Sequence, residues 1–166
     1  MRERHASRAR RAREFEEFLA GAAGRLLHAA TLLTAEAPDD NPRARRLLTL
    51  ALAQTYASWD RLRGEDPYAR ARQHLAIRFA REAWHRYGAL GRHRPDSGSV
   101  LARLSPQERL ILVLRMYEGV AEEQTAALLG LPAERVRRIC ARAMATLLHP
   151  PQKPVPPVLG AKVAPS

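Results

Sequence analysis

The amino-acid sequence predicts an all-α protein with a basic surface, and three observations support this prediction. Only 5% of the residues are aromatic, whereas Ala, Leu and Arg are abundant, a composition that favours helices over strands. Apolar residues recur at helical spacing between loops that are rich in Gly, Pro, Asn and Asp. The formal net charge of +11 points to a polyanionic partner such as nucleic acid.

The first part of the sequence predicts a basic arm followed by helices. Residues 1–12 form the arm, and from about residue 13 to residue 35 apolar side chains recur at helical spacing. Gly21 and Gly24 interrupt this pattern, so two short helices and one kinked helix fit equally well. A loop is predicted at 37–42, APDDNP. Residues 43–59 predict a helix that is apolar on more than one side, which suits either a central core helix or a hydrophobic contact surface for a partner.

Another helix is predicted over residues 68–87, and its two faces differ in character. One face is apolar and consists of Leu75, Ala76, Phe79, Ala80, Ala83, Trp84 and Tyr87. The other face has five basic or potentially basic side chains without a carboxylate among them: Arg70, His74, Arg78, Arg81 and His85. A charged stripe is often only a solvated face, but a stripe of one sign suits a phosphate backbone better.

Two segments rich in Pro, Gly or Ser divide the chain. Residues 88–103, which contain GRHRPDSGS, predict a flexible linker between domains. Residues 150–166 are rich in proline and predict an extended, disordered tail, to which the sequence assigns no function. We therefore expect two small helical domains, at 13–87 and 104–149. The first 94 residues have a net charge of +8 and residues 105–149 of only +1, so most of the basicity lies in the first half.

A strongly marked helix start follows the linker, in the run LSPQERLILVLRMYEG. Ser105 can cap this helix, Pro106 fits its first turn, and Glu108 completes a Ser-x-x-Glu capping box. An apolar stripe continues the helix until Gly119 ends it.

The next segment has the spacing of a helix-turn-helix. It predicts a short helix at 121–129, a tight turn at Gly130, and a longer helix that begins at Pro132. In this motif a small residue is needed where the helices cross, a Gly in the turn, and an aliphatic residue to lock the second helix. Ala126, Gly130 and Val136 occupy these positions. The rest of the small core is predicted to be Leu129, Leu131 and Ile139.

Helical geometry assigns two faces to the segment 132–148. The residues predicted to face inward are Val136, Ile139, Cys140, Ala143 and Leu147. Those predicted to face outward are Glu134, Arg135, Arg137, Arg138, Ala141 and Arg142. The second helix of this motif enters the major groove of DNA. We expect Arg135 and Arg138 to read bases, because Arg can bond guanine bidentately, and Arg137 and Arg142 to hold phosphates.

Several classes of function are excluded or disfavoured. Cys140 is the only cysteine, so it can form neither an intrachain disulfide nor a cysteine cluster for a metal, and we expect it to be a small core residue. The charged N-terminus does not resemble a signal peptide and no apolar run could cross a bilayer, so a cytoplasmic protein without a membrane partner is expected. The six His are scattered, and no nucleophile with a base, metal cluster or phosphate loop is evident. We expect neither enzymatic activity nor a cofactor.

The order of these segments resembles the small two-domain sigma factors of bacterial RNA polymerase, the extracytoplasmic-function group and particularly its actinobacterial branch. The run LSPQERLILVLRMYEG through GLPAERVRRICARA resembles the C-terminal sigma domain, which reads the upstream promoter element. FEEFLAGAAGRLLHAATLLTA, LALAQTYASW and HLAIRFAR resemble the N-terminal domain. The resemblance implies that double-stranded promoter DNA and the RNA polymerase core enzyme are partners, and it allows an anti-sigma or other protein partner.

The sequence differs from the family pattern at two surfaces. On the helix 43–59 the family has an acid, a Gln and a second acid that dock on the polymerase β′ subunit, and Arg46, Thr49 and Leu50 stand at these positions here. On the helix 68–87 the family often has an Asn and an Asp that engage the displaced promoter strand, where this sequence has His74 and Arg78. Two hypotheses follow: a divergent sigma factor, or a sigma-derived regulator that does not recruit core polymerase in the usual way.

Overall fold

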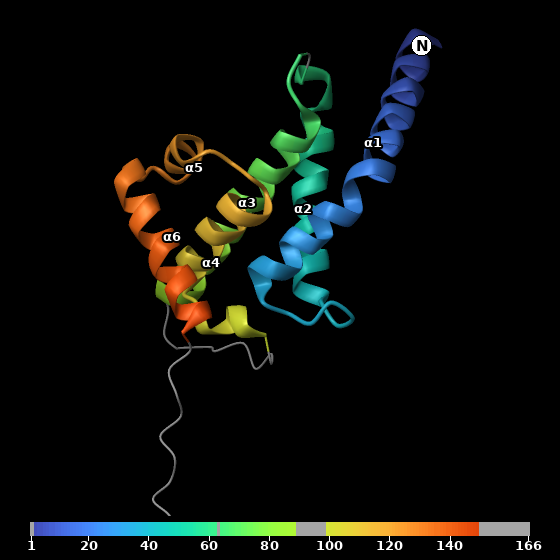
Figure 1. The fold of residues 1–166 in the computed structure, drawn as a ribbon. Helices are drawn as coiled ribbons and strands as arrows, with labels where there is room; N and C mark the ends of the chain where they lie inside the picture. The colour runs from blue at the N-terminus through green and yellow to red at the C-terminus, as the bar shows by residue number, and fades with distance from the viewer. Residues whose placement is uncertain (1, 63, 89–98, 150–166) are drawn as a thin grey trace, which may run out of the picture.

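The computed structural model describes residues 2–62, 64–88 and 99–149, which form helices and contain no β-strand. The all-α class is therefore confirmed. The α-helices are α1 (Arg2–Thr34), α2 (Pro42–Ala57), α3 (Pro67–Gly88), α4 (Pro106–Leu112), α5 (Glu122–Leu129) and α6 (Ala133–Leu148). Shorter turns are η1 (Trp59–Arg61), η2 (Val100–Arg103) and the π-helical η3 (Val113–Tyr117). Figure 1 shows α1, α2 and α3 on one side of the molecule and α5 and α6 on the other.

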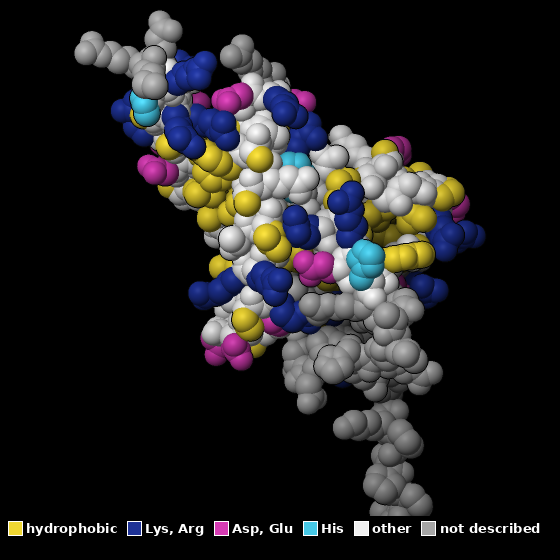
Figure 2. Space-filling model, turned by 180° about the vertical axis from the view of Figure 1, so that it is seen from behind, with side chains coloured by type: hydrophobic (Ala, Val, Ile, Leu, Met, Phe, Trp, Pro, Cys, Tyr) yellow, Lys and Arg dark blue, Asp and Glu magenta, His cyan; other side chains and the backbone are white. Residues whose placement is uncertain are grey.

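Helix α1 is continuous from Arg2 to Thr34, so of the two alternatives a single helix forms and not two short ones. Gly21 is exposed on a helix whose other face buries Ala22 and Leu26, and this burial outweighs the small cost of glycine in a helix. Residues 2–12, expected to be an arm, form the first turns of α1 and extend beyond the other helices (Figure 1). Basic side chains gather over these turns (Figure 2).

An aromatic cluster anchors the projecting part of α1. The Phe15 ring lies 4.9 Å from the Tyr56 ring and 5.1 Å from the Trp59 ring, measured between centroids. The Arg11 guanidinium lies over the Tyr56 ring, donates to the Tyr56 carbonyl, and pairs with Asp60 at 3.0 Å. These contacts fix the first half of α1 against the end of α2 and against η1.

Helix α2 lies between α1 and α3 and packs against both. Its buried residues are Ala44, Leu47, Leu48, Ala51 and Thr55, which share one face of the helix. Leu50, which lies off this face, is only half-buried. The packing against α1 and α3 supports the core-helix alternative, while a contact surface for a partner on the other side stays a prediction.

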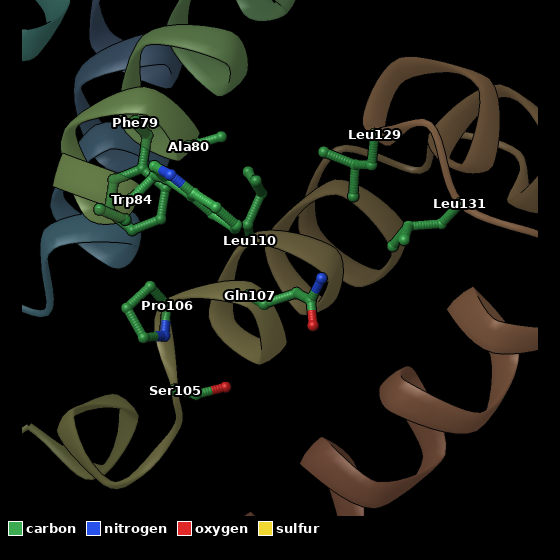
Figure 3. Close-up of a pocket in the computed structure, with 10 residues that line it drawn as sticks. Phe79, Ala80, Trp84, Ser105, Pro106, Gln107, Leu110, Leu129 and Leu131 are labelled. Carbon is green, nitrogen blue, oxygen red and sulfur yellow. The ribbon is translucent and has the colours of Figure 1, made fainter. Parts of the chain in front are cut away.

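Helix α3 departs from its predicted pattern at Trp84. Leu75, Ala76 and Phe79 are buried as expected, but Trp84 is 79% exposed although it was placed on the same apolar face, and the side chain of Tyr87 lies outside the described residues. Trp84 borders a hollow between α3 and α4, where no described helix covers it (Figure 3).

The two halves of the chain share one hydrophobic core. A single cluster joins buried residues of α1, α2 and α3 to Leu110 of α4 and to Val113 and Leu114 of η3. The division into two domains, 13–87 and 104–149, stays a prediction, but helices of these two segments are packed against each other. Residues 89–98 of the expected linker and the expected tail, 150–166, lie outside the described residues. Within the described part of the chain, no helix is both long and apolar enough to span a membrane.

Candidate nucleic-acid interface

Helices α5 and α6 form the predicted helix-turn-helix. Gly130 ends α5 with a φ of +64°, in the left-handed region that glycine adopts without a steric cost. The backbone N–H of Leu131 donates to the Ala126 carbonyl at 3.0 Å, which closes the end of α5 in the manner of a Schellman motif. Val136 is fully buried in a cluster with Ala126, Ile139 and Ile111 of α4. The three positions predicted for the motif are therefore confirmed.

Helix α4 supports the motif and begins with the predicted capping box. The Ser105 N–H donates to Glu108 Oε2 at 2.9 Å, and the Glu108 N–H donates to Ser105 Oγ at 3.3 Å. The other Glu108 oxygen accepts from Arg142 Nε of α6 at 2.8 Å. Burial raises the pKa of Glu108, but the bonds from Ser105 and the ion pair with Arg142 outweigh it and lower this pKa. The same carboxylate thus caps α4 and ties α6 to it.

The two faces of α6 agree with the sequence prediction. Val136, Ile139 and Ala143 are buried, and Cys140 is half-buried among core residues. Burial raises the pKa of the Cys140 thiol, which fits a packing role. The residues expected to face outward are all exposed: Glu134, Arg135, Arg137, Arg138, Ala141 and Arg142.

The four arginines of this face divide into two pairs. Arg137 binds Glu122 of α5 at 2.8 Å and Glu134 at 3.1 Å, and Arg142 binds Glu108 as described. Among the described residues, Arg135 and Arg138 make no side-chain hydrogen bond or ion pair. Arg137 and Arg142 therefore brace α6 against α5 and α4, whereas the guanidinium donors of Arg135 and Arg138 are available to a ligand.

The predicted basic stripe of α3 does not form one uniform surface. Arg81 is exposed, while Arg70 is half-buried and pairs with Glu65. His74 Nδ1 lies 3.0 Å from the Thr55 hydroxyl of α2, and burial, followed by the charge of Arg70, lowers the pKa of His74. Arg78 is half-buried, and its Nε has no hydrogen-bond partner among the described residues. His74 thus faces α2 rather than open solvent.

The predicted docking residues lie on the outer side of α2. Arg46 and Thr49 are exposed and Leu50 is half-buried, away from the buried residues of the helix. The Thr49 hydroxyl donates to the Arg45 carbonyl one turn earlier. The three side chains are accessible together on one face.

A buried carboxylate that the sequence reasoning did not single out joins the two halves. The Glu118 side chain, after η3, is 1% exposed and accepts hydrogen bonds from the Tyr68 hydroxyl of α3 at 2.9 and 3.0 Å. Arg25 of α1 and Arg72 of α3 lie 3.7 and 3.6 Å from its Oε2. We call these four residues the Glu118 joint. Burial and the bond to Glu118 raise the pKa of Tyr68, so the phenol stays protonated and donates.

The described residues contain no group of three His, Cys, Asp or Glu side chains that could hold a metal ion. What the geometry provides is a rigid pair of crossed helices with arginine donors on the outer face of the second helix. Such an arrangement can bind a polyanion and hydrogen-bond to base edges.

Comparison with known proteins gives the same result. Residues 100–149 match the family model of sigma-70 region 4. The RNA polymerase sigma-E factors of Streptomyces avermitilis and Streptomyces coelicolor are each 31% identical to this chain, over 81% of it and 83% and 84% of their own lengths. The sigma-E factor of Streptomyces antibioticus is 30% identical, over 81% and 82%. No solved structure matches significantly. The chain therefore belongs to the sigma factors of bacterial RNA polymerase, in the extracytoplasmic-function group of actinobacterial type.

Proposed function

We propose that this protein is a sigma factor that directs RNA polymerase to promoters, and that α6 reads the promoter DNA. The observation that supports this role best is the outer face of α6, where Arg135 and Arg138 are exposed and have no protein partner among the described residues. Family membership supports the same role. This role requires no catalytic activity of the chain itself. Because RNA polymerase acts in the cytoplasm of a bacterium, we propose that the chain acts there too.

Arg135 and Arg138 are the proposed base-reading residues. They are three positions apart and therefore lie on one face, in the N-terminal half of α6, which is the part of a recognition helix that reaches base edges. Each guanidinium can donate two parallel hydrogen bonds to a guanine. Because neither has to leave a protein partner first, binding does not have to break an existing ion pair.

Arg137 and Arg142 are the proposed phosphate contacts. Both are engaged by carboxylates in the free protein, but both are also more than half exposed. Because both guanidinium groups face solvent, a phosphate can approach either of them. Until then their glutamate partners hold the two side chains toward α5 and α4.

The basic side of α3 is the proposed contact for the displaced promoter strand. Arg81 is exposed and can contact phosphates without reading sequence, and half-buried Arg70 can do so if a phosphate replaces Glu65 as its partner. Since His74 is bonded to Thr55 and Arg78 is partly covered, we propose that these two residues mainly set the position of α3.

The outer face of α2, with Arg46, Thr49 and Leu50, is the proposed docking surface for the core polymerase. The family pattern at these positions is two acids and a Gln, so this surface has lost two negative charges and gained a positive one. We therefore propose that core polymerase is bound less tightly than by relatives with the full pattern.

Base selection by the reconstituted holoenzyme tests the role of α6. Promoter fragments are selected from a randomised pool with the parent chain, with Arg138→Ala, and with Arg142→Ala as the matched control. Arg138→Ala should cost about 1 to 3 kcal/mol on the preferred site and relax one base position, whereas Arg142→Ala should weaken all sequences alike. If Arg138→Ala selects the parent sequence with the parent affinity, α6 is not the reading helix.

A further inference from the structure

An apolar groove lies between the end of α3, the start of α4 and the turn of the helix-turn-helix. It has a volume of about 560 Å³, within the range of ligand-binding pockets. The side chains that shape it are Phe79, Trp84, Pro106, Leu110, Leu129 and Leu131. Figure 3 shows Trp84 and Leu110 on one side of the hollow and Leu129 and Leu131 on the other.

Trp84 is the exposed aromatic residue of the groove. Its side chain is 79% exposed, although it follows Phe79 and Ala80 along the apolar side of α3. An exposed indole beside several aliphatic side chains is a surface that gains free energy when a partner covers it. Among the described residues, nothing occupies the hollow between Trp84 and Leu131.

We propose that the proline-rich C-terminal segment of this same chain, residues 150–166, docks in the groove. The chemistry of the segment matches: PPQKPVPPVLG combines closely spaced prolines with Val155, Val158 and Leu159 and has no acidic residue. Proline-rich chains favour the polyproline II conformation, which loses little entropy on binding, and such segments dock in grooves that are lined by aromatic side chains.

The path of the chain favours the same occupant. Met144 and Leu147, in the last turns of α6, pack in one cluster with Leu104. Leu104 directly precedes Ser105 and Pro106, which line the groove. The last described residues of α6 therefore lie near the start of α4, which lines the groove. At about 3.1 Å per residue, the run from Pro150 to Leu159 is long enough to reach across it.

The segment 89–98, which follows α3 in the sequence, is a poorer match. Its sequence ALGRHRPDSG has two Arg, a His and an Asp, a single proline and only one large aliphatic residue. Because residues 150–166 are covalently attached, their effective concentration at the groove is on the order of millimolar. A weak contact is therefore enough to keep the groove occupied.

Quenching of Trp84 fluorescence by acrylamide tests this proposal. Trp59, the second tryptophan, is replaced in every sample by Trp59→Phe, so that only Trp84 emits. The full chain is compared with a chain that stops after His149. The quenching constant should rise by at least about twofold in the shortened chain, since a docked segment covers most of the surface that it contacts. A synthetic peptide of residues 150–166 should restore protection saturably.

Two sets of substitutions separate docking from a general effect of the tail. Replacing Val155, Val158 and Leu159 by Ser should expose Trp84 as truncation does, whereas the matched control, Lys153→Ser with Lys162→Ser, should leave it protected. The proposal is overturned if Trp84 is quenched equally in the full and shortened chains. It is also overturned if protection depends on protein concentration, because a second copy would then be the occupant.

Discussion

The helix-turn-helix and the Glu118 joint are both held by charged side chains, but in different ways. In the helix-turn-helix, the Arg137 and Arg142 side chains are 64% and 68% exposed, whereas the side chains of their partners Glu122 and Glu108 are 14% and 13% exposed. In the joint, Glu118 is buried and is bound by residues of α1 and α3 that lie far away in the sequence. An exposed guanidinium can exchange partners at a small cost, whereas a fully buried carboxylate cannot lose its donors without a large cost. This difference fits our proposal that α6 accepts DNA, and we expect the joint to hold the two halves together.

Removal of the buried carboxylate should have the largest effect on stability. Glu118→Ala takes away the acceptor of the Tyr68 hydroxyl and the counter-charge of Arg72, so the free energy of unfolding should fall by about 2 to 3 kcal/mol. Urea denaturation measures this change. The control is Glu134→Ala, which removes a carboxylate that is 63% exposed and should have a much smaller effect. Equal losses in the two variants would show that the joint does not hold the halves together.

Two glycine substitutions should act in opposite directions. Gly130→Ala forces an alanine into a left-handed conformation and should destabilise the protein by about 1 kcal/mol, although no atom lies within 4 Å of the added Cβ. Gly21→Ala places the same methyl group in open space on α1 and should stabilise the protein by about 0.5 to 1 kcal/mol. Thermal unfolding measures both changes. A loss of stability in Gly21→Ala would mean that α1 is not a regular helix at this position.

The contact between α2 and α3 should make stability depend modestly on pH. Burial, followed by the charge of Arg70, lowers the pKa of His74 in the folded state below its ordinary value of 6.5. The unfolded chain therefore binds more protons as the pH falls below 6.5, and stability should decrease on that side. His74→Gln should flatten the profile between pH 7 and the folded-state pKa, while the exposed His85→Gln should not. Denaturation midpoints of the parent chain and of both variants, measured across this pH range, test this prediction.

The helix-turn-helix could be predicted to within one residue at the starts of its two helices because its signals are local. The Ser105 capping box, the left-handed Gly130 and the two faces of α6 each depend on residues within a few turns of one another. The family resemblance strengthened the same prediction. Whether α2 is a core helix or a contact surface was left open by the sequence, because only the packing of α1 and α3 shows which of its faces is covered.

The features that the sequence did not predict depend on distant contacts. In the sequence, Glu118 is an acidic residue before Gly119 without any sign that its side chain is buried. Its burial follows only from the positions of Tyr68, Arg25 and Arg72. The periodicity of α3 places Trp84 on the buried face, but no periodicity shows where the bundle that covers this face ends. Similarly, the bond from His74 to Thr55 could not be foreseen from a stripe of basic residues.

Equilibrium binding to purified actinobacterial RNA polymerase core tests the central claim, that this chain is a sigma factor with a weakened docking surface on α2. We measure the affinity of the parent chain and of the triple variant Arg46→Asp, Thr49→Gln and Leu50→Glu, which restores the family pattern. The account predicts that the parent binds core saturably and that the triple variant binds at least tenfold more tightly, about 1.4 kcal/mol. Failure of both chains to bind core would contradict the account, because a sigma factor with the restored surface must bind.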